Sequence, residues 1–425
     1  MREPTLYHLT RLANGLTVAT ARMPHMASVS LGLWVGAGGR YEPVELNGAS
    51  HFIEHMLFKG TRRRSALAIS QDIEGVGGYL NAFTGEESTC FYSKARHDRF
   101  DELFDVLSDM FLNSRFAPAD IDKERGVIKE ELAMYLDQPQ HRVQELLNEM
   151  LWPDHPLGRP LTGTAETLEA MGRKQLLAFL RSHYVTSDLM IAAAGNLSHD
   201  QVVTAIVHVA ARFPQGRRPE YVAVKSVPRQ PAVRLFTKDT EQTQLALGIR
   251  TASRHDARRF ALRLLNTVLG ENMSSRLFQV VREDRGLAYS IYSVLSFFDD
   301  VGVLNVSAGL DAGNVPQVLK LIVRELRRLR DELLTAAELR RARDYVIGQL
   351  DLSLEGTENQ MMWLGEHYLG YGKISPAREI KQRLGAVKAS EIRAVARDFF
   401  HPTRMSLALV SPLKSANGLK RILAA

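Results

Sequence analysis

The sequence predicts an α+β fold made of two homologous domains. Two observations lead to this prediction. Short segments of alternating polarity are mixed with amphipathic helical segments without strict βαβ alternation, and parts of the first half of the chain recur in the second. The predicted strands are 18–21, 28–35, 246–250 and 302–308. With 425 residues, the chain is long enough for two or three domains with substantial cores.

Three pairs of segments recur in the same order along the chain. Their differences in residue number are 247 − 31 = 216, 400 − 184 = 216 and 349 − 131 = 218. The paired segments are 30–33 with 246–249, 183–195 with 399–411, and 131–132 with 349–350. A period this long exceeds that of any solenoid repeat and indicates a duplicated domain.

The two copies are joined by a segment rich in proline and polar residues, which favours an extended connector. It includes Pro214, Pro219, Pro228 and Pro231. We therefore expect an N-terminal domain at 1–215, a linker at 216–231 and a C-terminal domain at 232–425.

The charge pattern gives no indication of a nucleic-acid partner. The net charge of +6 is small for this length, and basic runs such as 62–64 are typical of solvated faces. The arginine-rich segment 324–343 has leucines at helical spacing, which predicts an amphipathic surface helix rather than a binding tail.

Several features favour a cytoplasmic protein without a membrane span. No apolar run reaches the roughly 18 residues of a transmembrane helix, and the N-terminus lacks the apolar segment of a secretion signal. Cys90 is the only cysteine, so no intrachain disulfide can form, and this fits a reducing compartment.

The segment His51-Phe52-Ile53-Glu54-His55 has the spacing of a metal site. On a helix, residues i and i+4 project from one face, so the imidazoles of His51 and His55 can hold one zinc ion. Glu54 lies on nearly the same face and can take a proton from a zinc-activated water without being a ligand. The pattern is the inverted form of the better-known zinc-peptidase motif. A chance match over so short a pattern is the alternative, so a third ligand is needed.

The candidate third ligand lies in segment 121–132, whose apolar residues recur with a helical rhythm. Glu124 and Glu131 are seven positions apart, so they share one face two turns apart, whereas Glu130 points about 100° away. The alternative is a charged, solvated helix face, which is the usual explanation of Glu/Lys runs.

Glu131 follows the His-x-x-Glu-His motif by 131 − 55 = 76 residues. A motif and a glutamate in this arrangement resemble those of the pitrilysin-type metallopeptidases, and in particular of their processing-peptidase branch. This branch includes the mitochondrial processing peptidase and its bacterial counterparts. The resemblance covers both halves and implies that Glu131 is the third zinc ligand beside His51 and His55. It also implies that Glu124 supports the site from behind the ligands. Each half is then expected to be a mostly antiparallel sheet packed with helices, and the chain to form half of a clam-like chamber.

The motif does not recur in the second copy. The positions that match the two histidines and the three glutamates hold Thr267, Gly270, Glu271, Gln349 and Ala342. We therefore expect one Zn²⁺ per chain, bound by the first half.

Segment 273–290 resembles the signature of the inactive half in this family. By this resemblance Arg282 and Tyr289 complete the site from across a chamber, in the same chain or across a dimer. Arginine binds a substrate carbonyl or carboxylate with a fixed fork, and a phenol donates to the oxyanion of a tetrahedral intermediate. From residue type alone, a surface cation and a core aromatic are the alternative.

Paired glycines, Gly77-Gly78, precede the strand-like segment 79–84. The resemblance makes this segment the edge strand of the active domain, where extended peptides add through backbone hydrogen bonds. Asn81 and Ala82 would then face the scissile region. A plain hairpin is the alternative.

These expectations describe a zinc metalloendopeptidase, a hydrolase that cuts unfolded peptides or oligopeptides in an enclosed chamber with Glu54 as general base. We expect peptide substrates and a homodimer, or a pair with a related partner chain. The main alternative is a non-catalytic structural or substrate-binding subunit of the same family. A peptide-binding module with structural zinc is the third hypothesis, but such a site is usually closed by a fourth Cys or His.

Overall fold

The structure, a computed structural model, describes residues 6–225 and 230–424. The chain forms two compact units of three segments each. Unit 1 comprises the chain up to Ala133, Arg159–Val222 and Leu352–Ile374. Unit 2 comprises Met134–Gly158, Ala223–Asp351 and the chain from Ser375 onward.

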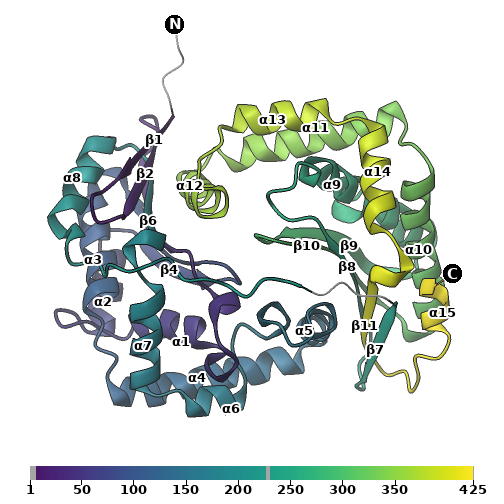
Figure 1. The fold of residues 1–425 in the computed structure, drawn as a ribbon, viewed down its shortest axis with the longest axis horizontal. Coiled ribbons are helices and arrows are strands. Elements are labelled where there is room, and N and C mark those ends of the chain that lie inside the picture. The colour runs from purple at the N-terminus through teal and green to yellow at the C-terminus, as the bar shows by residue number, and fades with distance from the viewer. Residues whose placement is uncertain (1–5, 226–229, 425) are drawn as a thin grey trace, which may run out of the picture. The chain divides into compact units, whose positions relative to one another are not determined.

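Unit 1 is built on a six-stranded sheet in the order β1-β2-β6-β3-β5-β4 (Figure 1). Only β2 and β6 pair in parallel, and the other neighbours are antiparallel. The strands are β1 (Tyr7–Arg11), β2 (Thr17–Arg22), β3 (Ser28–Val35), β4 (Tyr79–Thr84), β5 (Thr89–Arg96) and β6 (Leu189–Gly195). The expected antiparallel-rich sheet is confirmed.

Unit 2 repeats this topology with five strands in the order β7-β11-β8-β10-β9. Again only one pair, β7 and β11, is parallel. The strands are β7 (Ala232–Thr237), β8 (Thr243–Thr251), β9 (Ala288–Phe297), β10 (Gly302–Leu310) and β11 (Met405–Ser411). The same order and directions in both sheets are the structural form of the duplication, and the four predicted strands fall within β2, β3, β8 and β10.

Helices cover both faces of the sheet in unit 1, and the alternation of β3 shows why. Leu31 and Leu33 pack into the larger helical core, whereas Trp34 points to the opposite face and packs with Met361 of α12. The helices of the larger layer are α1 (Ala49–Leu57), α2 (Ala66–Glu74), α3 (Phe100–Asn113), α6 (Ala165–Ala170), α7 (Arg173–His183) and α8 (His199–Ala210). The opposite face is covered by α12 (Thr357–Tyr371), which lies against β2, β3 and β6.

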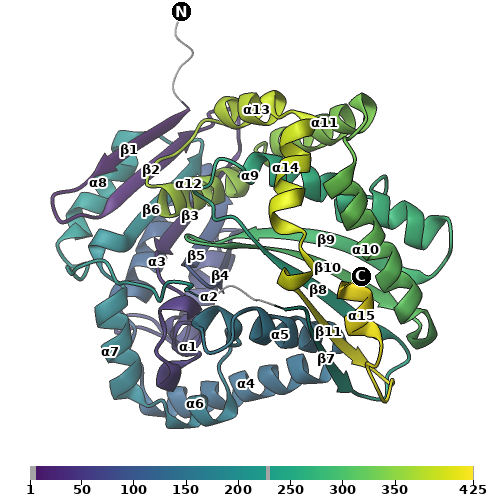
Figure 2. The same ribbon diagram turned by 45° about the vertical axis from the view of Figure 1, so that its right-hand side comes forward.

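In unit 2, α5 (Pro139–Leu151) lies against β8 and β11 (Figure 2). Its side chains Leu147 and Leu151 belong to the apolar cluster at this contact. The other helices of this unit are α9 (Arg259–Asn266), α10 (Val315–Asp331), α13 (Ala377–Ala386), α14 (Ala389–Phe399) and α15 (Leu419–Ala424). Two long helices, α4 (Pro118–Asp137) and α11 (Ala336–Ser353), carry the chain from one unit into the other.

Each unit thus receives one helical segment from the other half of the sequence. Segment 134–158 joins unit 2 and segment 352–374 joins unit 1, and their bounds differ in residue number by 352 − 134 = 218 and 374 − 158 = 216. These are the spacings of the sequence repeat, so the exchange is reciprocal. The boundaries 1–215, 216–231 and 232–425 describe the repeats along the chain and stay a prediction. Within the predicted linker, residues 226–229, with Pro228, lie outside the described residues.

The single helix predicted over 324–343 is wrong. The chain breaks between α10 and α11, because Thr335 caps a new helix. Its hydroxyl accepts from the Glu338 N–H at 3.2 Å, and the Glu338 carboxylate accepts from the Thr335 N–H at 3.2 Å. None of the described helices is both long and apolar enough to cross a membrane.

Candidate metal centre

Helix α1 carries the two histidines on one face. The His51 and His55 rings lie 4.6 Å apart between centroids. The opposite face is fixed, because Phe52, Ile53 and Met56 are fully buried in the core of unit 1. Apolar packing on one side therefore directs both imidazoles to the other side.

The start of α1 is capped by a buried carboxylate from outside the helix. Gly48 precedes the helix with φ +94°, a conformation that favours glycine, and offers no side chain for capping. Glu42 takes this role: its Oε2 accepts from the Gly48 N–H and its Oε1 from the Ser50 N–H, both at 2.7 Å. A third bond, from Asn47 Nδ2, is 3.2 Å long. An anion at a helix N-terminus is also favoured by the helix dipole.

Helix α4 brings Glu131 to the histidines. Its Oε2 lies 3.7 Å from Nε2 of His51 and 3.6 Å from Nε2 of His55. The three ligand atoms lie within 4.8 Å of one another, the one such group among the described residues. The structure therefore brings together the three residues that were predicted as ligands.

Glu124 lies on the same face of α4 as Glu131 and contacts the far side of the His55 ring. It is almost fully buried, and its Oε2 is 3.2 Å from Nδ1 of His55, the ring nitrogen that does not face Glu131. Lys59 pairs with the other oxygen of Glu124 at 2.8 Å and offsets its charge. A carboxylate in this place fixes the ring orientation and makes Nε2 a better metal ligand.

The donor set fits a zinc ion. Two imidazole Nε2 atoms and one carboxylate oxygen converge, which is a three-ligand set that leaves a fourth position for water or substrate. Burial and the neighbouring His55 lower the pKa of His51 to about 4, although the Glu131 carboxylate acts in the opposite direction. His51 is therefore neutral near pH 7, which is the form that binds metal.

Glu54 stands beside the cluster and is held by a threonine of β4. The Thr84 hydroxyl donates to Glu54 Oε2 at 2.5 Å. Burial raises the pKa of Glu54, whereas the Thr84 hydrogen bond and His55 act to lower it. A fixed, half-buried carboxylate next to a metal site is suited to accept and release a proton.

Strand β4 is an edge strand of its sheet, and among the described residues its one strand partner is β5. Asn81 is exposed on this edge, and its Oδ1 accepts from the N–H of Ala82 at 2.8 Å. Thr84 ends the same strand, so the segment that carries Asn81 and Ala82 leads directly to the partner of Glu54.

Arg282 and Tyr289 lie in unit 2, close to each other. The Arg282 guanidinium is 5.8 Å from the centre of the Tyr289 ring and 4.9 Å from that of Phe278. Tyr289 lies at the start of β9 and is 75% exposed, so it is not the core aromatic of the alternative interpretation.

In unit 2, Thr267 and Glu271, which match the two histidines, bind each other, and Glu271 also pairs with Arg263 from outside the matched motif. Arg263 binds the Glu271 carboxylate through both terminal nitrogens, and the Thr267 hydroxyl donates to Glu271 Oε2 at 2.7 Å. The only glutamate at a matched position is therefore occupied by arginine.

Sequence reasoning missed three residues that organise the site: Glu42, Lys59 and Thr84. Glu42 had a weak signal: it precedes Asn47-Gly48, a pair typical of a turn, and a glutamate before such a turn can reach forward to the start of the helix that follows. Lys59 and Thr84 had none, since their contacts arise only from the packing of α4 and β4 against α1.

Comparison with known families gives two adjacent matches. Residues 17–165 match the insulinase family (peptidase family M16), and residues 170–346 match the peptidase M16 inactive domain. The first match contains the histidine motif and Glu131, and the second contains Arg282 and Tyr289.

Curated relatives align along nearly the whole chain. A protein of Mycobacterium leprae (strain TN) named as an uncharacterized zinc protease is 39% identical over 97% of this chain and 93% of its own length. A protein of Bacillus subtilis (strain 168), also named as an uncharacterized zinc protease, is 37% identical over 94% of this chain and 97% of its own length.

Solved structures share the fold at low identity. A protease from Helicobacter pylori superposes with a TM-score of 0.90 at 19% identity, covering 96% of this chain and 99% of that one. A chain of Complex III2 from Candida albicans has a TM-score of 0.84 at 20% identity, covering 98% and 100%. At these identities the likeness concerns the fold alone.

Proposed function

This chain belongs to peptidase family M16, and from that membership we propose that it is a zinc-dependent endopeptidase acting on unfolded peptides. The observation that carries the proposal is the convergence of His51, His55 and Glu131, with Glu54 beside them. Relatives named zinc proteases support zinc and peptide hydrolysis at the level of the family.

In this proposal His51, His55 and Glu131 hold one zinc ion per chain, and Glu124 orients His55 from behind. A zinc ion held in this place would supply a Lewis acid that polarises the scissile carbonyl and lowers the pKa of water to about 7. The neutral state of His51 and the fixed tautomer of His55 prepare the site for this ion.

Glu54 acts as the general base. It takes a proton from the attacking water and then passes it to the leaving amine of the cleaved bond. Thr84 holds one of its oxygens, so the other stays free to face the substrate. Burial disfavours the charged carboxylate and brings its pKa closer to that of a group that both accepts and donates near neutral pH.

The substrate backbone adds to the β4 edge, where Asn81 and Ala82 face the scissile region. Arg282 binds a substrate carbonyl or carboxylate, and the Tyr289 phenol donates to the oxyanion. Each such donor is worth about 3 kcal/mol of transition-state stabilisation in other enzymes. Their mutual contact and the exposure of Tyr289 support this role.

The proposed assembly is a cytoplasmic homodimer, or a pair with a related chain, that encloses a chamber. Access to such a chamber would favour unfolded peptides over folded proteins. Arg282 and Tyr289 then act in the same chain or on the site of the partner.

The test pairs zinc content with cleavage of a quenched, unstructured peptide, for wild type and Glu54→Gln. We expect about one zinc per chain in both proteins. We expect activity to fall at least 100-fold in the variant, the usual effect of losing a general base. Glu130→Gln is the matched control, since Glu130 is exposed on the same helix as Glu131 and should change neither quantity. Unchanged cleavage by Glu54→Gln would contradict the mechanism.

A non-catalytic subunit is the second candidate, favoured by one finding: the same fold occurs in a chain of Complex III2. For this chain the role would be to hold peptides or to support a partner. Zinc in both proteins with no cleavage by either would favour this candidate.

A further inference from the structure

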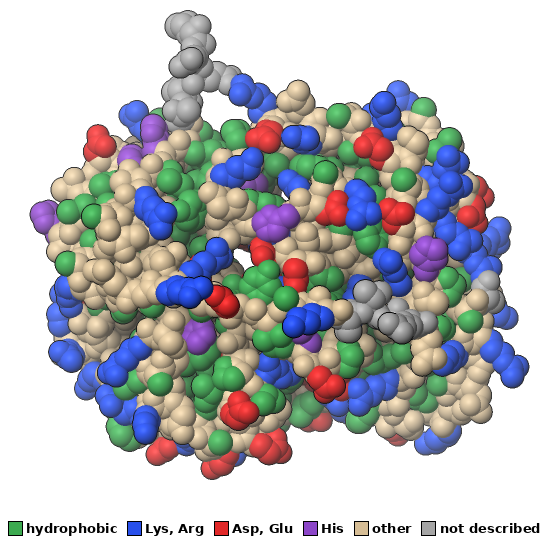
Figure 3. Space-filling view, viewed as in Figure 1, with side chains coloured by type: hydrophobic (Ala, Val, Ile, Leu, Met, Phe, Trp, Pro, Cys, Tyr) green, Lys and Arg blue, Asp and Glu red, His purple; other side chains and the backbone are tan. Residues whose placement is uncertain are grey.

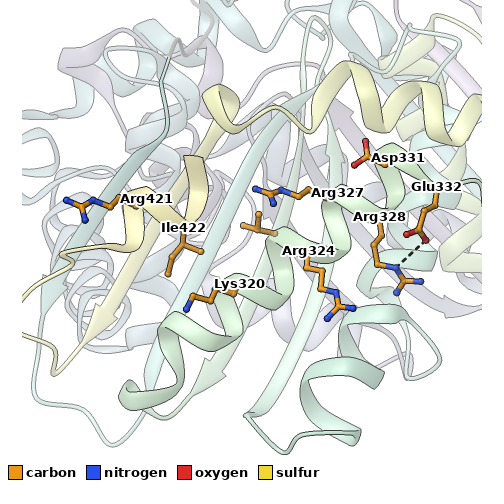
Figure 4. Close-up of a pocket in the computed structure, with 9 residues that line it drawn as sticks. Lys320, Arg324, Arg327, Arg328, Asp331, Glu332, Arg421 and Ile422 are labelled. Atoms are coloured by element: carbon orange, nitrogen blue, oxygen red, sulfur yellow. Dashed lines mark hydrogen bonds and ion pairs between the residues drawn. The ribbon is translucent and has the colours of Figure 1, made fainter. Parts of the chain in front are cut away.

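The outer side of α10 presents a stripe of cations toward α15. Lys320, Arg324 and Arg327 follow one another at spacings of four and three positions, which places them on one face of the helix. They line a hollow of about 520 Å³ whose apolar part comes from Val323 and Ile422. Figure 4 shows Lys320 and Arg327 extending from α10 toward α15. Lys and Arg side chains gather along this side of unit 2 (Figure 3).

The charges around this hollow, here called the α10 pocket, are unbalanced. Five cations and two carboxylates line it: Lys320, Arg324, Arg327, Arg328, Arg421, Asp331 and Glu332. Both carboxylates are already engaged, because Glu332 pairs with Arg328 at 3.3 Å and Asp331 with Arg330 at 3.0 Å.

Four of the cations lack such partners. Within the described part of the chain, no ion pair or side-chain hydrogen bond involves Lys320, Arg324, Arg327 or Arg421; Arg327 contributes only a longer-range attraction to Asp331. Like charges gathered on one helix face repel one another, and an anion bound among them would relieve this repulsion.

The duplicated half provides an internal comparison. Helices α3 and α10 begin at Phe100 and Val315, which gives an offset in residue number of 315 − 100 = 215. At this offset eight of the nine buried positions of α3 coincide with buried positions of α10. Asp105 and Asp109 then match Lys320 and Arg324, so the charge at these two positions is reversed between the halves; the one buried position that does not match is Asp109, which is buried where Arg324 is exposed.

In unit 1 the same face is neutralised by the protein itself. Arg64 binds Asp105 at 2.5 Å and Asp109 at 2.8 Å, and Arg63 binds Asp105 at 2.6 Å. Unit 2 has the reversed charges without the counter-charges. The acidic side chains of α3 are thus paired within the protein, whereas Lys320, Arg324, Arg327 and Arg421 around the α10 pocket are available to an external anion.

We propose that the α10 pocket binds a phosphate-bearing anion. Guanidinium groups match the oxygens of phosphate in a fixed fork, and a lysine adds a mobile charge. Val323 and Ile422 provide an apolar surface for the organic part of such a ligand. The site is independent of the metal centre and of the proposed peptidase activity.

Binding is tested by calorimetry with inorganic tripolyphosphate on the full-length protein at about 150 mM salt. We expect saturable binding that weakens as salt is raised. Arg327→Glu should weaken it at least tenfold, the effect expected from losing one charge-assisted contact. Arg340→Glu is the matched control: it makes the same charge change on an exposed residue of α11 that does not line the pocket, and should leave binding within about twofold.

A second arm identifies the source of the phosphate. Vesicles of phosphatidylcholine with and without phosphatidylglycerol are sedimented with wild type, Arg327→Glu and Arg340→Glu. Binding of tripolyphosphate identifies a free anion, and binding only of phosphatidylglycerol vesicles identifies a lipid headgroup, provided that Arg327→Glu abolishes it. The proposal is overturned if neither ligand binds, or if both variants weaken binding equally.

Discussion

Glu42 organises the start of helix α1 although it was not identified from the sequence. It accepts two backbone N–H groups at the start of the helix that carries both histidines, and it is 2% exposed. In Glu42→Gln, one acceptor becomes an N–H₂ group that faces a backbone donor. We expect the free energy of unfolding to fall by about 2 kcal/mol, the cost of losing a buried, charge-assisted hydrogen bond. Zinc affinity should fall as well, because α1 loses its fixed start.

The change in stability is measured by urea unfolding of the metal-free protein, and the affinity by competition with a chelator. Glu45→Gln is the control, since Glu45 is exposed a few positions further along the same loop. Equal stability and zinc affinity in both variants would show that the cap does not organise the site.

His51 should make the metal-free protein sensitive to acid. Burial and His55 lower its pKa to about 4, against 6.5 in the unfolded chain. As the pH falls below 6.5, His51 of the unfolded chain binds a proton, whereas His51 of the folded protein stays neutral. His51 therefore contributes full stability above pH 6.5, and this contribution is lost progressively as the pH falls toward 4.

Urea unfolding of metal-free wild type and His51→Asn between about pH 7.5 and 4.5 tests this expectation. Stability of the wild type should fall more steeply with acid than that of the variant. Parallel curves would mean that His51 titrates alike in the folded and unfolded states.

At the residue scale, the sequence predicted the cluster that the structure assembles: the spacing of His51 and His55, and the shared face of Glu124 and Glu131, are properties of single helices. Thr84 and Lys59 could not be found in this way, because their partners are distant in sequence. Helical periodicity relates positions three, four or seven apart, whereas Thr84 meets Glu54 only through the placement of β4 beside α1.

At the scale of elements, the tight contact between α12 and β3 depends on a glycine. A Cβ at Gly365 would overlap the fully buried indole of Trp34. Gly365→Ala should therefore lower the free energy of unfolding by about 1–3 kcal/mol, in spite of the better helix propensity of alanine.

Gly348→Ala is the matched comparison, because Gly348 lies within α11 and a Cβ there meets nothing within 4 Å. This change should raise the free energy of unfolding by about 0.5–1 kcal/mol through helix propensity alone. Chemical denaturation of both variants measures the two effects. Two shifts of the same sign would rule out close packing as the role of Gly365.

Alternating polarity predicted β2, β3, β8 and β10 well, because most residues of each strand are buried and its apolar side chains recur at every second position. The same approach joined α10 and α11 into one helix, since leucine spacing continues across the break. The missed signal was local: Thr335 followed one turn later by Glu338 is a capping box, and it starts a helix whatever precedes it.

At the scale of the whole molecule, the constant repeat spacing predicted two copies of one domain, and the matching sheet orders agree with it. The exchange of α5 and α12 between the copies could not be read from the repeat. Both helices recur at the repeat spacing, so the repeat alone would place α5 in the first domain and α12 in the second. The structure decides which sheet each helix joins: α4 leads α5 to the sheet of unit 2, and α11 leads α12 to the sheet of unit 1, where their apolar sides are buried.

Because of this exchange, the sheet of each half is covered in part by a helix from the other half. The reactivity of Cys90 measures whether α12 covers the sheet of unit 1. This thiol is fully buried in the cluster formed by Trp34 and Met190 of the sheet with Met361 and Leu364 of α12. In the full-length protein we expect it to resist thiol reagents, both because it is covered and because burial raises its pKa.

A fragment of residues 1–231 lacks α12, so its Cys90 should react at a rate close to that of the urea-unfolded chain. Addition of residues 232–425 by co-expression should restore protection, since this fragment supplies α12 and receives α5. A fragment 1–231 that protects Cys90 unaided would show that α12 is dispensable to its sheet, and that each half folds as an independent domain.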